Sequence, residues 1–86
     1  EVTATMSKFK VGDKVKLNLS NKDFKELLKY NAQIEREMML CRNARYMIIT
    51  EAEDWGEPWG MQYSVDVDGG RTIWNDNDLK LYNDGV

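Results

Sequence analysis

The 86-residue chain carries 12 basic and 15 acidic side chains, no histidine and one cysteine, Cys41. This length predicts one domain with a small hydrophobic core, and no apolar run is long enough to cross a membrane. A single cysteine cannot form an internal disulfide, which favours a reducing, cytoplasmic setting. Because histidine is the commonest general base and metal ligand, we expect no enzymatic activity, no metal site and no cofactor.

The start of the chain and its charge distribution suggest how it is organised. Residues 1–5 precede Met6 and a new polar segment, and we interpret them as a remnant of expression, with residues 6–86 forming one domain. Residues 1–45 have a net charge of +4 and residues 46–86 have a net charge of −7. This asymmetry marks a nucleic-acid surface, or strands from the two halves interleave and mix the charges in the folded domain.

The first two predicted elements differ in their hydrophobic period. Residues 9–19 alternate between apolar and polar side chains, which predicts a half-buried strand interrupted near Gly12. After Ser20 the apolar side chains recur at helical spacing, with Asn31 as the one polar break. Ser20 followed by Asp23 resembles a capping box. We therefore expect one long helix at about residues 21–41, between the first two strands.

Extended segments return in the second half of the chain. Apolar and alternating patterns predict strands at residues 45–52, 61–67, 71–74 and 79–82. Residues 68–70, Asp-Gly-Gly, predict a tight hairpin because glycine adopts positive φ without steric cost. Residues 75–78 predict a short turn before the last strand. The expected fold class is α+β, mainly β, with five strands and one long helix.

Two stretches carry a resemblance to a known group of folds. VGDKVKL at residues 11–17 resembles the first strand of SH3-like small barrels of the tudor, KOW and Mind-bomb type, and DGGRTIWNDNDLKLY at residues 68–82 resembles their closing hairpin, turn and last strand. The resemblance implies a five-stranded barrel with the helix inserted where SH3 domains have a long open loop. The composition also resembles accessory proteins of bacteriophages or prophages, which implies an accessory or inhibitor role.

The segment EAEDWGEPWG, residues 51–60, predicts a surface loop that binds a protein or peptide. An exposed tryptophan offers a large apolar area and an aromatic face for cations, and the surrounding carboxylates favour a basic segment. The SH3 resemblance likewise implies a basic or proline-containing peptide. Alternatively, one or both rings fold back over the core. The predicted partner-binding residues are Trp55, Trp59, Glu53, Asp54, Glu57, Trp74 and Tyr63.

The alternative function is nucleic-acid binding through a basic face of the first strand and the helix. Lysines along such a face would contact phosphates while aromatic rings stack on bases. A solvated outer face explains the same lysines, and the acidic second half opposes strong nucleic-acid affinity. The residues of this alternative face are Lys8, Lys10, Lys14, Lys16, Lys22, Lys25 and Lys29.

The helix also has apolar side chains outside its main stripe. Tyr30, Met39 and Leu40 lie off the stripe, which predicts either self-association through the helix or contact with a partner's groove. Cys41 ends the stripe and is expected to be a buried, small apolar residue. The sequence therefore predicts a non-enzymatic protein-binding domain, with nucleic-acid binding as the alternative.

Overall fold

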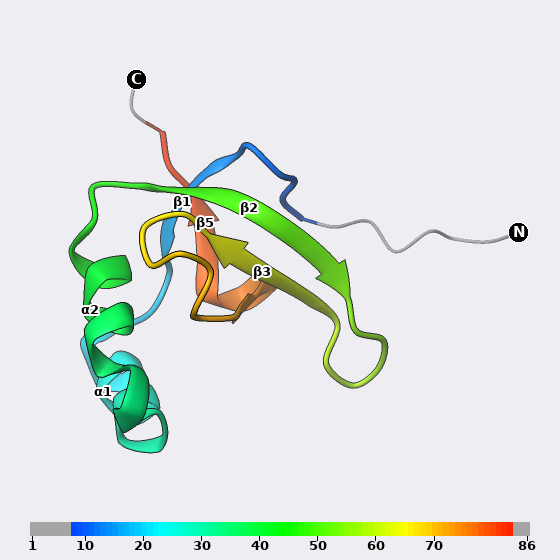
Figure 1. Cartoon of the computed structure of the whole chain (residues 1–86). Coiled ribbons are helices and arrows are strands. Elements are labelled where there is room, and N and C mark those ends of the chain that lie inside the picture. Colours follow the sequence, from blue (N-terminus) through cyan, green and yellow to red (C-terminus); the bar gives the residue numbers. More distant parts are fainter. Residues whose placement is uncertain (1–7, 84–86) are drawn as a thin grey trace, which may run out of the picture.

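A computed structural model describes residues 8–83 as an α+β fold with a five-stranded antiparallel sheet and two helices (Figure 1). The remnant expected at residues 1–5, and Met6, lie outside the described residues. In the part of the chain that the structure describes, no helix is long and apolar enough to cross a membrane. The elements are β1 (Lys14–Leu17), α1 (Asn21–Tyr30), η1 (Ala32–Ile34), α2 (Glu35–Asn43), β2 (Met47–Asp54), β3 (Met61–Val65), β4 (Trp74–Asn75), η2 (Asp76–Asp78) and β5 (Leu79–Leu81).

The strands are ordered β4-β3-β2-β1-β5, with β2 at the centre. The start of β2 pairs with β1 through Met47 and Ile48, and the rest of β2 pairs with β3 as far as Asp54. The α+β class and the five strands are confirmed. The predicted closed barrel is not shown, because no ladder joins β4 to β5 within residues 8–83.

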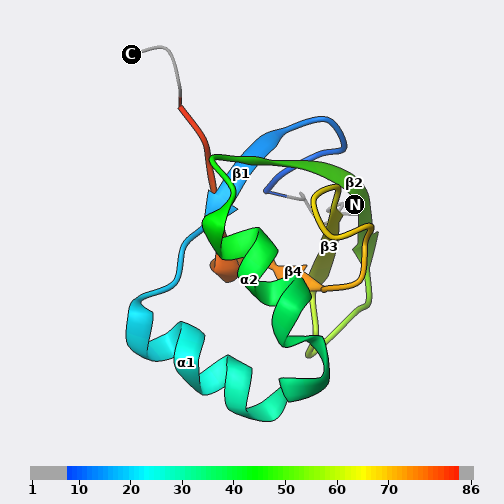
Figure 2. The same cartoon turned by 60° about the vertical axis from the view of Figure 1, so that its left-hand side comes forward.

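Two shorter helices stand where one long helix was predicted. α1 begins as expected, because the Ser20 hydroxyl accepts a hydrogen bond from the Asp23 N–H at 3.1 Å. It ends at Tyr30. The next residue, Asn31, donates its side-chain amide to the Leu27 carbonyl at 2.9 Å and its backbone N–H to the Leu28 carbonyl at 3.2 Å. Asparagine competes in this way for helix carbonyls, so the chain bends and α2 runs at an angle to α1 (Figure 2).

The first strand is shorter than the alternation predicts. Gly12 has φ of 98° and lies in a turn, so the strand begins only at Lys14. The turn is fixed by hydrogen bonds from the Gly12 N–H to the Ile49 carbonyl and from the Asp13 N–H to the Lys10 carbonyl. Val11, which precedes the turn, is therefore exposed rather than buried with the rest of the apolar face.

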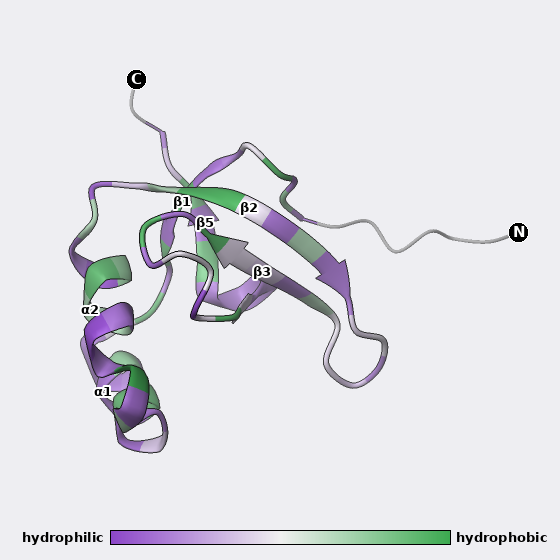
Figure 3. Cartoon of the chain, in the orientation of Figure 1, coloured by the Kyte–Doolittle hydropathy of each residue, from purple (hydrophilic) through white to green (hydrophobic). Residues whose placement is uncertain are grey.

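One hydrophobic core lies between the sheet and the two helices. Phe24 of α1 and Met38 of α2 both reach it, although the two helices point in different directions. In Figure 3 the start of β2 is hydrophobic and its far end, toward the β2–β3 loop, is hydrophilic. The buried apolar residues are Phe9, Val15, Phe24, Met38, Cys41, Met47, Ile49, Met61, Tyr63, Val65, Trp74 and Leu79.

Candidate binding site

The β2–β3 hairpin carries the tryptophan loop away from the helices (Figure 1). Residues 55–60 connect the two strands. The Trp55 N–H donates to the Gly60 carbonyl at 2.9 Å, and the Gly60 N–H donates to the Gly56 carbonyl at 2.7 Å. Gly56 and Gly60 have φ of 74° and 70°, a conformation that few other residues adopt without strain. The loop backbone is therefore held in one folded turn.

Both tryptophan rings of this loop are exposed rather than folded over the core. Trp55 is 48% exposed and Trp59 is 62% exposed. The Trp55 indole N–H donates to a carboxylate oxygen of Glu53 at 3.0 Å. The Trp59 carbonyl accepts a hydrogen bond from the Gln62 side chain at 2.7 Å. The structure thus places two exposed aromatic rings at the tip of the hairpin.

The charges of the loop have one sign. Glu51, Glu53, Asp54 and Glu57 are all exposed, and residues 51–60 contain no basic side chain. Asp54 also fixes the turn, because its carboxylate accepts the Gly56 N–H at 2.9 Å. A uniformly negative, partly apolar surface attracts cationic groups and raises their rate of association. The predicted residues Trp55, Trp59, Glu53, Asp54 and Glu57 are therefore brought together.

Tyr63, by contrast, lies in the core and not on the loop surface. It is fully buried, on the same face of β3 as Met61 and Val65. Its hydroxyl accepts the Phe9 N–H at 3.2 Å and donates to an Asp76 carboxylate oxygen at 2.6 Å. Burial, together with the bond to Asp76, raises the pKa of Tyr63 above its usual value. The alternation of residues 61–65 already placed Tyr63 on this inward face.

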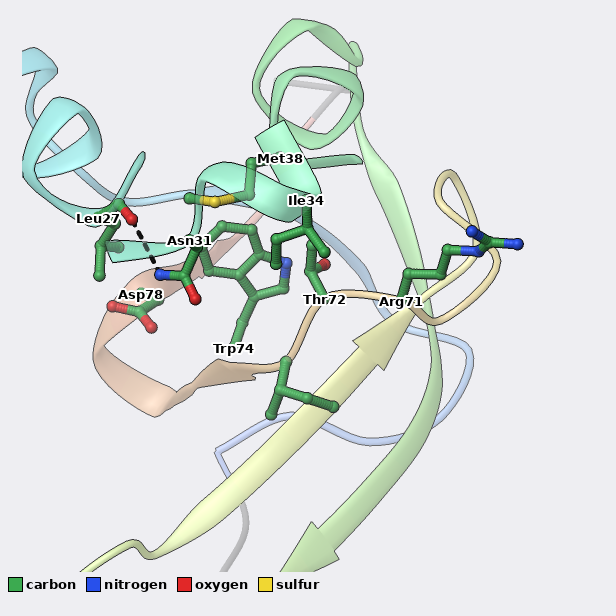
Figure 4. A pocket seen from close by; sticks show the side chains of 9 residues that line it. Leu27, Asn31, Ile34, Met38, Arg71, Thr72, Trp74 and Asp78 are labelled. Carbon is green, nitrogen blue, oxygen red and sulfur yellow. Dashed lines mark hydrogen bonds between the residues drawn. The ribbon is translucent and has the colours of Figure 1, made fainter. Parts of the chain in front are cut away.

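Trp74 is also buried, at 2% exposure, beside a cavity between the helix junction and β4 (Figure 4). Its indole N–H has no hydrogen-bond partner in residues 8–83. The cavity measures about 220 Å³, less than the roughly 300 Å³ typical of the smallest ligand pockets. Its lining residues are Leu27, Asn31, Ile34, Met38, Arg71, Thr72, Ile73, Trp74 and Asp78.

Cys41 belongs to a buried polar cluster that the sequence did not reveal. Its sulfur lies 3.6 Å from an Asp68 carboxylate oxygen and 3.5 Å from the Thr72 hydroxyl. The same carboxylate accepts hydrogen bonds from the N–H groups of Gly70 and Thr72, each at 2.9 Å. Burial raises the pKa of the Cys41 thiol to about 11, so very little nucleophilic thiolate is present at neutral pH. The expected burial of Cys41 is confirmed.

The seven lysines of the alternative face lie in two separate groups. Lys8, Lys10, Lys14 and Lys16 lie on or before β1, whereas Lys22, Lys25 and Lys29 lie on α1, which both views show away from β1. Lys16 is partly buried, and its ammonium group donates to the carbonyls of Ala44 and Arg45 at the end of α2. The Lys14 ammonium lies 4.8 Å from the Tyr46 ring centroid. The lysines therefore come from two elements that lie apart in both views.

The apolar residues outside the helical stripe differ in exposure. Tyr30 is 79% exposed and Leu40 is 47% exposed, whereas Met39 packs against the core. Among residues 8–83 there is no cluster of three or more cysteine or carboxylate groups suited to a metal ion. The aromatic and acidic loop is therefore the best-defined candidate for a binding surface. Comparisons of the chain with protein-family models, with curated proteins and with solved structures found no match.

Proposed function

We propose that this domain is a non-enzymatic protein-binding module that binds a basic protein or peptide segment on its β2–β3 loop. One observation carries the proposal. Trp55 and Trp59 are 48% and 62% exposed in a loop whose backbone is fixed by hydrogen bonds and whose charged side chains are all acidic. A partner that covers these rings removes a large apolar area from water.

The hydrogen bonds within the loop favour binding energetically. A loop that is already folded before a partner binds loses less conformational freedom, so more of the contact energy contributes to affinity. Trp55 is already oriented by its hydrogen bond to Glu53. The carboxylates around the rings favour basic partners and reject acidic ones through charge repulsion. The expected partner therefore combines lysine or arginine with at least one apolar or aromatic side chain.

A displayed library of random peptides provides the test. We expect the immobilised domain to enrich basic peptides, and Trp55→Ala to weaken their binding by roughly thirtyfold, which corresponds to about 2 kcal/mol. The melting temperature should change by only a few degrees, as is usual for a surface substitution. Tyr30→Ala is the matched control, because it removes a 79% exposed aromatic ring from α1.

The outcomes separate a binding anchor from a residue needed for folding. Retention of the selected peptides by a domain with Trp55→Ala and Trp59→Ala would rule out the loop as the site. Loss of binding only in proportion to the unfolded fraction would show that the rings support the fold instead. A selection with no basic enrichment would contradict the expected partner class.

Nucleic-acid binding through the lysines is the alternative proposal. It ranks lower because the lysines fall in two groups and Lys16 is engaged at the end of α2. Fluorescence anisotropy with a single-stranded oligonucleotide tests it, and a steep loss of affinity with rising salt is expected if phosphates are contacted. The SH3-like classification, the phage accessory role and self-association through the helix are further proposals that rest on the sequence patterns.

A further inference from the structure

The outer edge of β2 continues beyond its neighbour β1. β1 pairs with β2 only at Met47 and Ile48, and the turn at Gly12 and Asp13 adds two hydrogen bonds to Ile49. β2 itself runs on to Asp54, where its pairing is with β3 on the opposite side. Among residues 8–83, no strand pairs with the outer edge of β2 from Ala52 to Asp54.

The alternation of hydrogen-bonded pairs between β2 and β3 shows which backbone groups of β2 face that edge. The Trp55 N–H donates to the Gly60 carbonyl, so the backbone N–H of Trp55 faces β3. Hydrogen-bonded and non-hydrogen-bonded pairs alternate along an antiparallel ladder. Glu51 and Glu53 therefore direct their N–H and C=O groups toward β3. Ala52 and Asp54 direct theirs to the outer edge, where no backbone hydrogen bond to residues 8–83 engages them.

The side chains along this edge define the chemistry of a suitable partner. Glu51, Glu53 and Trp55 alternate onto one face of β2, and the bond from the Trp55 indole to Glu53 shows that the last two share that face. Exposed edge strands commonly carry charges that prevent pairing with another copy of the same chain. Here the charges are acidic, so they repel a second copy and complement an extended segment with basic side chains at every second position.

We propose that the basic partner binds as an added β-strand on the outer edge of β2. Its backbone would pair with Ala52 and Asp54, its basic side chains would lie beside Glu51 and Glu53, and one end would contact Trp55. Strand addition of this kind derives affinity from backbone hydrogen bonds and specificity from alternate side chains. This inference rests on the proposed function of the loop. It adds that the partner binds in an extended conformation along the outer edge of β2.

A synthetic peptide that alternates valine and lysine over seven residues is the probe. It is compared with two versions, one N-methylated at the lysines and one at the valines. Because alternate N–H groups of an added strand face the edge, one version should bind at least tenfold more weakly and the other within about twofold. The amide resonances of Ala52 and Asp54 should shift on binding. Glu51→Lys should weaken binding, whereas Glu26→Lys on α1, the matched charge reversal, should not.

The outcomes separate a failure of strand addition from a failure of the proposed function of the loop. If both N-methylated versions bind like the parent peptide while Trp55→Ala still weakens all three, strand addition is overturned and the loop remains the site. If both versions weaken equally and the Ala52 and Asp54 amides do not shift, strand addition is likewise overturned. If the parent peptide does not bind, or binds Trp55→Ala as tightly as the wild type, the proposed function of the loop fails as well.

Discussion

Replacing Tyr63 with phenylalanine removes one hydroxyl from the core and leaves the ring in place. The hydroxyl accepts the Phe9 N–H at 3.2 Å and donates to Asp76 at 2.6 Å. The substitution removes the hydrogen bond between this hydroxyl and the N–H of Phe9, which is 2% exposed, whereas Asp76 is partly exposed and can be rehydrated. Removing one partner of a buried hydrogen bond costs about 1–3 kcal/mol.

We therefore expect Tyr63→Phe to lower the free energy of unfolding by about 2 kcal/mol. For a domain of this size, that loss corresponds to a fall in melting temperature of about 8–16 °C. Urea denaturation followed by tryptophan fluorescence measures the first quantity, and calorimetry measures the second. Tyr30→Phe is the matched control, because its ring is 79% exposed and the change should stay within about 0.5 kcal/mol.

The same variant distinguishes a core tyrosine from a partner-binding tyrosine. Since Tyr63 is fully buried, peptide affinity of the folded fraction should remain within about twofold. Equal stability of Tyr63→Phe and Tyr30→Phe would refute the reasoning about the lost hydrogen bond to the Phe9 N–H. A large loss of peptide affinity without a loss of stability would show that Tyr63 takes part in partner binding.

Two further predictions concern local features. Ser20→Ala should cost about 1 kcal/mol of stability in urea denaturation because the Asp23 N–H loses its cap, whereas Ser20→Asp should keep most of it; equal losses in both would exclude capping. The pKa of the Cys41 thiol rises from 9.0 to about 11 on folding, so the unfolded chain ionises first. The contribution of the neutral thiol to the free energy of unfolding should therefore be fully present below pH 9. The free energy of unfolding should then fall between pH 9 and 11, on the order of 2 kcal/mol. Cys41→Ala should show a smaller fall over this range, and identical profiles would contradict the assignment.

Local sequence signals were sufficient for the elements whose causes are local. The change of hydrophobic period at Ser20 and the hydroxyl of that residue predicted where α1 begins. The glycines at positions 12, 69 and 70 predicted turns, and all three have positive φ. The predicted tight hairpin at 68–70 is wrong, because β3 ends at Val65 and β4 begins only at Trp74. The turn residues of segment 51–60 predicted a loop between two strands, but the loop covers only residues 55–60 because β2 extends to Asp54. In each case the determining interactions lie within a few residues along the chain.

The helix break depended on more than local propensity. A straight helix over residues 21–41 would be about 31 Å long, and its stripe would extend along one direction. The bend at Asn31 lets Phe24 and Met38 reach one core from different directions. The sequence showed a polar residue at this position, but the gain from packing both halves against one sheet is a property of the whole fold.

Strand pairing decided which of two neighbouring residues faces inward. Alternation requires Ile73 and Trp74 to point to opposite sides and does not say which side is the core. In the sheet Trp74 lies opposite Tyr63, so both rings share the inner face. Ile73 is consequently 45% exposed. This choice follows from the register between β3 and β4, which no pattern within either strand specifies.

The sequence by itself determined that two tryptophans and four carboxylates lie close together, because all six fall within residues 51–60. Only the tertiary structure decided that Trp55 and Trp59 are exposed. The reason is geometric: β2 runs to Asp54, beyond its pairing with β1 at Met47 and Ile48, and so carries the loop away from the core. Whether a ring covers a core depends on the distance between them, and the relative lengths of paired strands set that distance.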